Sequence, residues 1–236
     1  ESSYRFCEYQ RCYAKIIRPM TFTIIDYEPS TSSIGVCSAT SSPAHGNRCL
    51  HYSLQHGVVI SQGVSNVHHG IIGLELLALD FPPLKCLEIT RSQDLNVDYR
   101  QIIVMNFKGE KAAFTGGNTA KFRDHIEGLD FIVAGNHLQN QNVIYAIKDS
   151  FESSSGDLEQ RLIKAIKSGE KAGGDLNGSF SAFLLVLQPS QLQPFGAHLN
   201  IRVDYAPNAM EHLEEALQKY LLSKTERINN PFAYLS

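Results

Sequence analysis

The sequence predicts an α+β fold built on antiparallel sheets. Strand-like segments come in groups, helix-like segments come in pairs, and no single strand–helix unit repeats along the chain. A parallel, doubly wound sheet would instead need regular alternation of strands and helices. The sequence contains no internal repeat and no linker that would divide the chain. We therefore expect residues 20–236 to form one domain, with residues 1–19 as an extension outside the fold.

The expected strands are short apolar or alternating segments bounded by turn residues. Thr21, Thr23 and Asp26 interrupt the apolar side chains of the first one. The run GVVISQG is apolar and bounded by glycine, as in a buried strand. RQIIVMNFKGEKAAFTGG predicts a hairpin with Lys108 and Gly109 at its turn. The expected strands are 22–28, 36–39, 57–63, the two arms of this hairpin, 129–136, 181–187 and 198–203.

The expected helices carry apolar residues at helical spacing. In one of them Leu158, Leu162 and Ile166 fall on a single face, and the sequence Phe-Pro-Pro ends another. The glycine-rich segment SGEKAGGDLNGS follows the helix that starts at Leu158. Such a loop often carries function when a rigid scaffold holds it. The expected helices cover 71–79, 84–91, 141–151, 158–166 and 209–222.

Composition and charge exclude several classes of function. The 236 residues are 43% hydrophobic and 19% charged, with a formal net charge of −3. Nucleic-acid binders usually carry a clustered basic face, and no such cluster is present. No apolar run approaches the roughly 20 residues of a membrane span, and the first residues lack the apolar core of a signal peptide. We expect a cytoplasmic protein without nucleic-acid or membrane partners.

Cysteine and histidine spacing does not predict a metal site. The five cysteines are odd in number, and the spacing of Cys7 and Cys12 does not fit a zinc knuckle. Free thiols in a reducing compartment explain them. His68 and His69 are adjacent, so their side chains are expected to point apart, and no acidic partner stands at a known ligand spacing. We expect neither a metal nor a cofactor.

The sequence offers three hydroxyl nucleophiles for consideration. A nucleophile elbow, a phosphate-binding loop and a dinucleotide fingerprint are all absent. Ser38 and Ser181 would each need a base and an orienting acid that the sequence does not assign, and sheet-face or turn serines are the alternative interpretation. Thr21 follows Met20 at the start of a predicted strand. If the chain began at Thr21, its own α-amine, with an unperturbed pKa of about 7.7–8.0, could take the hydroxyl proton.

Several segments in order resemble a known family. MTFTIIDYEPSTSSIGVCSATSSPAHGNR, GVVISQGVSNVHHGIIGLELL, RQIIVMNFKGEKAAFTG, VAGNHL, AGGDLNGSFSA and LNIRVDYAP are similar to segments of the domain of unknown function 1028 family. The resemblance runs from Met20 to about Leu222. It implies a fold like that of N-terminal-nucleophile hydrolases, a four-layer αββα sandwich, and cleavage of a small amide or peptide-like bond. It also places the family's first residue after methionine on Thr21.

The resemblance carries further positions over one at a time. It implies that Asn136 and Asp175 act with Thr21 as catalytic residues. Asn136 or the backbone amides of Gly173 and Gly174 would stabilise an oxyanion, and Asp175 would accept a hydrogen bond from the α-amine or from a substrate ammonium group. Turn capping is the alternative for Asn136 and Asp175. Four positions would bind substrate: Gln62, Gly174, Arg202 and Asp204. A sheet-face ion pair is the alternative for the last two.

This chain departs from the family pattern near the presumed site. Asn177 replaces an arginine, Phe180 replaces a glutamine, and Tyr205-Ala206 replaces Asp-His. The departures leave two hypotheses open. One is an N-terminal threonine hydrolase, and its partner is a small amide or peptide-like substrate. The other is a non-catalytic binding or assembly module on the same fold. Exposed apolar faces would suit a homo-oligomer, with a dimer as the default.

Overall fold

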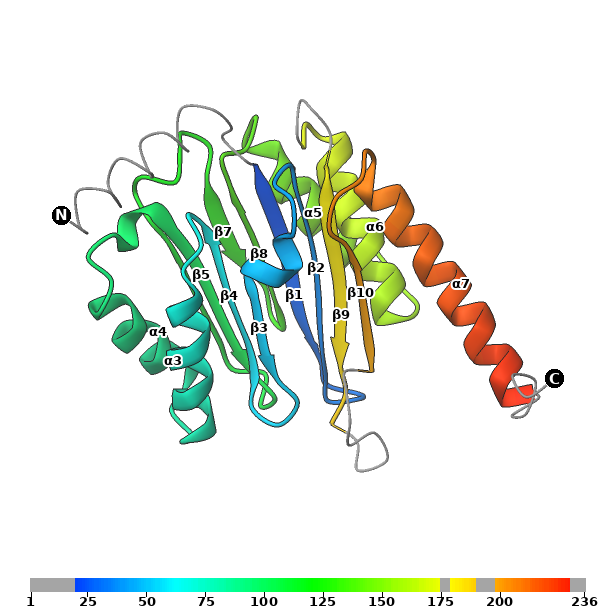
Figure 1. The fold of residues 1–236 in the computed structure, drawn as a ribbon, viewed down its shortest axis with the longest axis horizontal. Coiled ribbons are helices and arrows are strands. Elements are labelled where there is room, and N and C mark those ends of the chain that lie inside the picture. The colour runs from blue at the N-terminus through cyan, green and yellow to red at the C-terminus, as the bar shows by residue number, and fades with distance from the viewer. Residues whose placement is uncertain (1–19, 175–178, 190–197, 230–236) are drawn as a thin grey trace.

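A computed structural model of the protein describes residues 20–174, 179–189 and 198–229. Two antiparallel sheets pack face to face, and helices cover the outer face of each sheet (Figure 1). The order of layers is therefore helix, sheet, sheet, helix. This arrangement confirms the predicted α+β sandwich with antiparallel sheets.

The larger sheet has six strands in the order β10-β9-β2-β1-β8-β7. Its central strands are buried on both faces, which is why β9 reads in the sequence as a continuous apolar run. Strand β1 lies between β2 and β8, so its first residue has a neighbour on each side. The strands are β1 (Thr21–Glu28), β2 (Ser33–Thr40), β7 (Asp124–Glu127), β8 (Phe131–Asn136), β9 (Ser181–Leu187) and β10 (Leu199–Val203).

The smaller sheet has four strands in sequential order, β3-β4-β5-β6. Its central pair aligns Gln62 with Gln101 and Gly63 with Arg100. The strands are β3 (Leu50–Ser53), β4 (Gly57–Gly63), β5 (Arg100–Asn106) and β6 (Lys111–Thr115). The hairpin of β5 and β6 turns at Lys108 and Gly109, as the sequence predicts.

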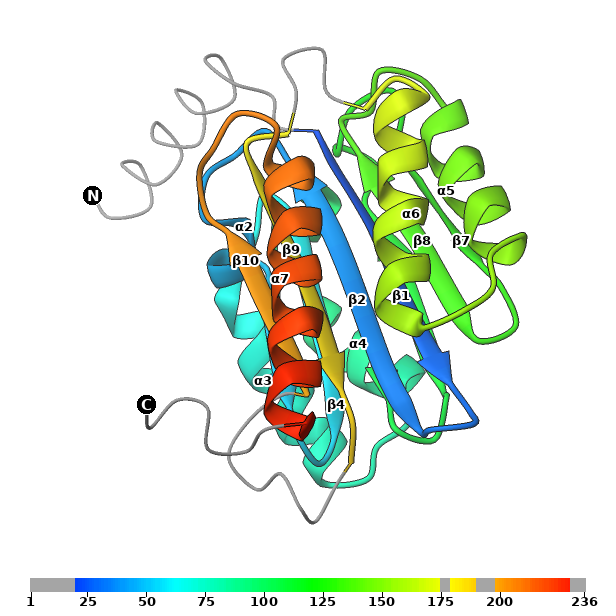
Figure 2. The same cartoon turned by 90° about the vertical axis from the view of Figure 1, so that its right-hand side faces the viewer.

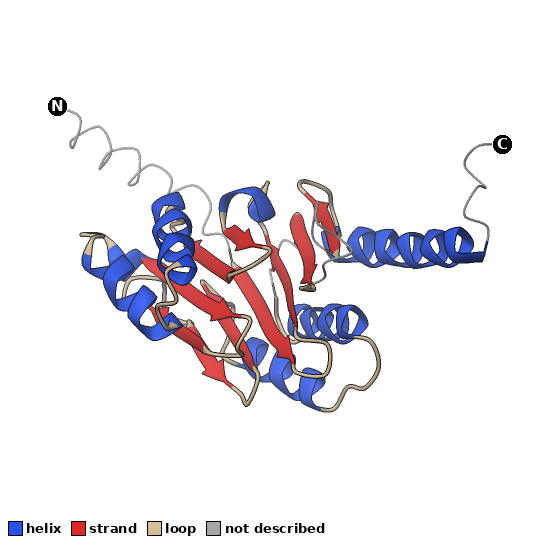
Figure 3. Ribbon diagram, turned by 90° about the horizontal axis from the view of Figure 1, so that it is seen from below, coloured by secondary structure: helices blue, strands red, loops and turns tan. Residues whose placement is uncertain are grey.

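Two groups of helices form the outer layers. Helices α3 (Val67–Ala78) and α4 (Pro83–Ser92) pack on the smaller sheet. Helices α5 (Asn142–Glu152), α6 (Leu158–Lys171) and α7 (Ala209–Asn229) pack on the larger sheet (Figure 2). Seen from below, α7 extends well past the sheets (Figure 3). Two short elements, α2 (His45–Arg48) and the 3₁₀ helix η1 (Val97–Tyr99), connect strands and helices.

Alternation along the strands sorts the side chains into three apolar clusters. Phe22 and Ile24 of β1 pack under α5 and α6, whereas Ile25 faces the smaller sheet. In the smaller sheet Val59 faces α3 and α4, whereas Ile60 faces the larger sheet. The two sheets thus separate the layer between them from both helix layers. A polar side chain in this layer must therefore form its hydrogen bonds within the layer.

The element boundaries follow the predictions with explainable differences. Helix α3 begins at Val67 because the Asn66 side chain accepts a hydrogen bond from the His68 backbone N–H and caps the helix. Strand β2 is longer than predicted. The sequence did not predict β3, β7 or α2, which are all four residues long. Among the residues that the structure describes, no helix combines the length and apolarity needed to cross a membrane.

Candidate functional site

Polar side chains gather at one end of the layer between the sheets, where β1 begins. Thr21 lies opposite Thr40 of β2 on one side and opposite Asn136 of β8 on the other. Thr23, Gln62 and Gln101 complete the group from both sheets, and their side chains are fully buried. Burying so many polar groups is costly unless each is hydrogen-bonded. We name Thr21, Thr23, Thr40, Gln62, Gln101 and Asn136 the polar end.

The Thr21 hydroxyl is held by Thr40. The two Oγ1 atoms are 3.1 Å apart, and Thr40 Oγ1 donates to the Met20 carbonyl oxygen at 2.7 Å. A hydroxyl has one proton, so Thr40 accepts from Thr21 rather than donating to it. Thr40 therefore contacts both the hydroxyl of Thr21 and the Met20 carbonyl, which is bonded to the backbone nitrogen of Thr21. Thr21 itself is only 5% exposed, with Met20 in place before it.

A chain of hydrogen bonds links the two sheets just inside Thr21. Thr23 Oγ1 donates to Gln62 Oε1 at 2.8 Å, and Gln62 Nε2 donates to Gln101 Oε1 at 2.7 Å. Asn136 Nδ2 donates to the same Gln101 oxygen at 2.9 Å. The proton of each donor is thus assigned along the chain. Within the part of the chain that the structure describes, Gln101 Oε1 is the acceptor of Asn136 Nδ2, and no second acceptor is present.

Gln101 is the hub of this chain. Its Nε2 lies 2.8 Å from Thr115 Oγ1, 2.9 Å from the Asp124 carbonyl and 3.1 Å from the Gly135 carbonyl. Its Oε1 accepts from Gln62 and Asn136. One buried side chain therefore fixes the orientation of two neighbours and ties β5 to β8. Its loss would leave buried donors without acceptors, which is the expensive case.

Ser38 and His45 extend the polar end toward α2. Ser38 Oγ lies 2.7 Å from His45 Nε2 and 2.6 Å from Thr23 Oγ1, and Ser181 Oγ accepts from the His45 backbone N–H at 3.1 Å. Burial lowers the pKa of His45 to about 3, with a smaller contribution from the Arg48 charge. The imidazole is therefore neutral at physiological pH. Ser38 and Ser181, both sequence candidates for a nucleophile, are fully buried and engaged in this packing.

The glycine-rich loop is described only at its start. The backbone N–H groups of Gly173 and Gly174 both donate to the Glu170 carbonyl, at 3.3 and 2.9 Å, and so close the end of α6. Neither amide is free to bind an oxyanion in this arrangement. Asn136 is the predicted donor that the structure does place beside Thr21. Asp175 and Asn177 lie outside the described residues.

Arg202 and Asp204 lie apart from the polar end. Arg202 Nη2 contacts Asp204 Oδ2 at 2.8 Å, and the two side chains are 34% and 51% exposed. Strand β10 is three strands away from β1, which is roughly 14 Å at the usual strand spacing. The structure thus brings Thr21, Gln62 and Asn136 together, and it leaves Arg202 and Asp204 as an ion pair on the edge strand.

Two of the residues that depart from the family pattern contact each other. The rings of Phe180 and Tyr205 stack with centroids 5.6 Å apart and an interplanar angle of 14°. The backbone supports the pair, because the Phe180 N–H donates to the Thr40 carbonyl and the Ala206 N–H donates to the Phe180 carbonyl. The two departures therefore form one aromatic contact at the strand ends.

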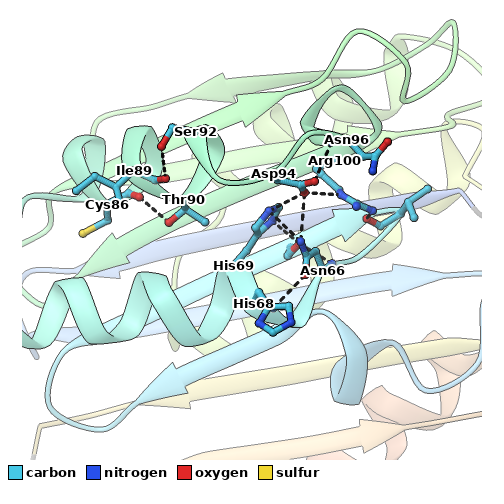
Figure 4. A network of polar contacts seen from close by, with 12 residues as sticks. Asn66, His68, His69, Cys86, Ile89, Thr90, Ser92, Asp94, Asn96 and Arg100 are labelled. Carbon is cyan, nitrogen blue, oxygen red and sulfur yellow. Dashed lines mark hydrogen bonds and ion pairs between the residues drawn. The ribbon is translucent and has the colours of Figure 1, made fainter. Parts of the chain in front are cut away.

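The adjacent histidines separate, as the sequence analysis expected. His68 is exposed on α3, whereas His69 is buried, with Nε2 2.9 Å from Asp94 Oδ2 (Figure 4). Asp94 also binds Arg100 Nε at 2.9 Å. This second polar cluster lies on the helix-covered face of the smaller sheet. The sequence analysis did not predict it, because Asp94 stands in an unpatterned segment after α4.

Sequence reasoning also missed Thr23, Thr40 and Gln101. A usable signal was present: Gln62 and Gln101 are amide residues near the ends of largely apolar strands, GVVISQG and RQIIVMN. A buried amide side chain needs hydrogen-bond partners. Pairing these two polar positions between the neighbouring strands β4 and β5 would have indicated the hub.

Comparisons with known proteins agree on one family. The model of a family of unknown function, DUF1028, matches residues 21–213, and so begins at Thr21. A crystal structure of protein SPO2555 from Silicibacter pomeroyi, also assigned to DUF1028, is similar with a TM-score of 0.78 and 32% sequence identity. The similarity covers 85% of this chain and 85% of that one. No curated protein matches the chain.

Proposed function

This chain belongs to the DUF1028 family, and from that premise we propose that it is an N-terminal threonine hydrolase of small amide or peptide-like bonds. The observation that carries the proposal is Thr40 Oγ1, which lies 3.1 Å from the Thr21 hydroxyl and 2.7 Å from the carbonyl on the amino side of Thr21. One side chain thus holds the nucleophile and the group at its nitrogen together. A chain that begins at Thr21 would have a free amine there.

The reaction uses the α-amine of Thr21 as its base. The amine takes the hydroxyl proton while Oγ1 attacks the substrate carbonyl carbon, and it then gives the proton to the leaving amine as the C–N bond breaks. The product at this stage is an ester on Thr21. Water attacks that ester with the amine again as base, the C–O bond to Thr21 breaks, the amine returns the proton to Oγ1, and the carboxylic acid leaves.

The neighbours of Thr21 suit the charges that this reaction develops. Among the described residues, Asn136 has one Nδ2 proton without an acceptor, and this amide lies beside Thr21, where a tetrahedral intermediate would carry its negative oxygen. Thr40 loses its acceptor when Met20 is absent and then can bond to the α-amine. We assign Gln62 to the substrate-binding side of the site, where it acts through its hydrogen bond with Thr23. We assign Asp175 to binding the protonated α-amine of Thr21. Arg202 and Asp204 would act only on a substrate long enough to reach β10.

The test is turnover by a chain that begins at Thr21. This chain, its Thr21→Ala variant and a chain that keeps Met20 are incubated with a panel of short N-acyl amides and dipeptides, and the released amine is measured. Release by the first chain alone supports the proposal. Equal release by the chain with Met20 contradicts it, because that chain has no free amine on Thr21. No release from any substrate favours the binding-module alternative.

A further inference from the structure

A second buried polar cluster lies directly behind the polar end. Asp94 follows α4 and accepts from three side chains and one backbone group: Arg100 Nε and His69 Nε2, each at 2.9 Å, Asn66 Nδ2 at 3.2 Å, and the Asn96 N–H at 2.9 Å (Figure 4). Burial raises the pKa of Asp94, but the hydrogen bonds from Arg100, Asn96 and Asn66, together with the Arg100 charge, outweigh burial and hold the pKa at about 2. Asp94 therefore stays ionised and joins α3, its cap and β5 through one carboxylate.

His69 connects this carboxylate to β4. Burial lowers its pKa against the opposing effect of Asp94, and this lowered pKa favours the neutral ring. An ionised carboxylate only accepts, so His69 Nε2–H donates to Asp94 and Nδ1 accepts from the Ser61 hydroxyl at 3.1 Å. Ser61 Oγ in turn accepts from the Asn66 N–H at 3.1 Å. Every polar atom in this path has a defined role.

Hydrogen bonds link Ser61 to His69 and His69 to Asp94, as in the triad of a serine hydrolase, but the burial of these side chains argues against that chemistry. Ser61 is fully buried and His69 is 1% exposed, so no substrate carbonyl reaches the hydroxyl. The cluster is better explained by what it is attached to. Ser61 directly precedes Gln62, and Arg100 directly precedes Gln101.

The two clusters are opposite faces of the same strand pair. Gln62 pairs with Gln101, and Gly63 pairs with Arg100. Successive side chains on a strand point to opposite faces, so the glutamines enter the layer between the sheets while Ser61 and Arg100 point toward α3. Arg100 also donates through Nη1 to the Val64 carbonyl, past the end of the ladder. Hydrogen bonds on the α3 side of the smaller sheet thus fix the ends of β4 and β5.

We infer that Asp94 is a positioning residue for the polar end. Through Arg100 and His69 it fixes the backbones that carry Gln101 and Gln62, and these side chains in turn orient Asn136 and Thr23. The effect of Asp94 on the reactivity of Thr21 rests on the proposed function. The effect of Asp94 on the positions of Gln62 and Gln101 is independent of the proposed function.

The experiment compares Asp94→Asn with Asp98→Asn. Both variants remove one negative charge, but Asp98 is exposed in η1, outside this hydrogen-bonded cluster. Hydrogen exchange is measured at the backbone amides of Gln62 and Gln101, relative to Leu184 in the other sheet. We expect Asp94→Asn to accelerate exchange at the two glutamines by about tenfold to a hundredfold, because the variant loses a charge-assisted hydrogen bond. Exchange at Leu184 should not change to the same extent.

A second readout addresses the site. In chains that begin at Thr21, a threonine-reactive β-lactone should label Asp94→Asn with a maximal rate at least about tenfold lower, at an unchanged reagent affinity. If Asp94→Asn does not fold, Arg100→Lys is used, and the same effects are expected in a smaller size. Glutamine exchange that equals that of Asp98→Asn overturns the inference. Absence of labelling in the wild-type chain counts against the proposed function, while exchange still decides the inference.

Discussion

The two ends of the layer between the sheets are equally buried but chemically opposite. At one end Ile25, Ile103 and Met105 form an apolar core, and at the other the same strands carry Thr21, Thr23 and Gln101. The change from polar to apolar occurs at the same level on β1, β4 and β5. Nothing in the backbone requires it, because apolar residues fill the equivalent positions at the other end. This difference is what the proposed function requires of the polar end.

The largest stability effect is expected from the hub. Gln101→Leu leaves Gln62 and Asn136 as buried donors without an acceptor, and it should lower the free energy of unfolding by about 3–5 kcal/mol. In the apolar end, Ile103→Val should lower it by about 1 kcal/mol. Urea unfolding of both variants measures the difference. Equal losses would show that the polar end is no more tightly coupled than ordinary core.

A second contrast lies along β1 itself, where Asp26 is buried at the far end. Burial raises the pKa of Asp26 to about 7, partly offset by Arg161, while Glu28 and Asp130 raise it and Lys111 lowers it. The folded state then holds a proton that the unfolded state releases above about pH 4. The stability due to protonated Asp26 is full below pH 4 and is lost as pH rises toward 7.

Asp26→Asn should therefore raise the free energy of unfolding at pH 8 by about 2–4 kcal/mol and leave it nearly unchanged at pH 3. The measurement is urea unfolding across this pH range. A variant that is less stable than the wild type at pH 8 would show that the ionised carboxylate has a stabilising partner.

His45 should give the opposite slope. Its pKa is lowered from 6.5 to about 3, so the unfolded state binds a proton between these values and the folded state does not. The stability that neutral His45 contributes is full above pH 6.5 and is lost as pH falls toward 3. His45→Gln removes this term, so stability should fall less on acidification from pH 6.5 to 4. An unchanged acid slope would show that His45 is already protonated in the folded state.

The smallest effect is expected at the edge strand. Arg202→Ala breaks an exposed ion pair and should cost less than about 1 kcal/mol in thermal or urea unfolding. It should leave labelling of Thr21 by a small electrophile unchanged, since β10 is distant from β1. Loss of labelling in this variant would place Arg202 in the reactive site after all.

The fold was more predictable from the sequence than the site. The bounds of β4 and β9 follow from apolar runs that both faces bury, and α6 follows from its apolar stripe. The short α2 was not predictable because Ala44, just before it, adopts a left-handed φ of 55° without a glycine signal. Thr40 meets Thr21 through the pairing of β1 with β2, whereas Gln101 meets Asn136 only because the two sheets pack face to face. The polar positions in GVVISQG and RQIIVMN mark Gln62 and Gln101, but no local pattern reports which residues of the other sheet they contact.

The central claim is tested most directly by covalent labelling of a chain that begins at Thr21. The folded chain is treated with a β-lactone, and peptide mass spectrometry locates the adduct. The account predicts one adduct per chain, an ester on Thr21, and none in Thr21→Ala or in a chain that keeps Met20. A well-folded chain whose Thr21 stays unlabelled, or an adduct on another hydroxyl such as Ser38, would contradict it.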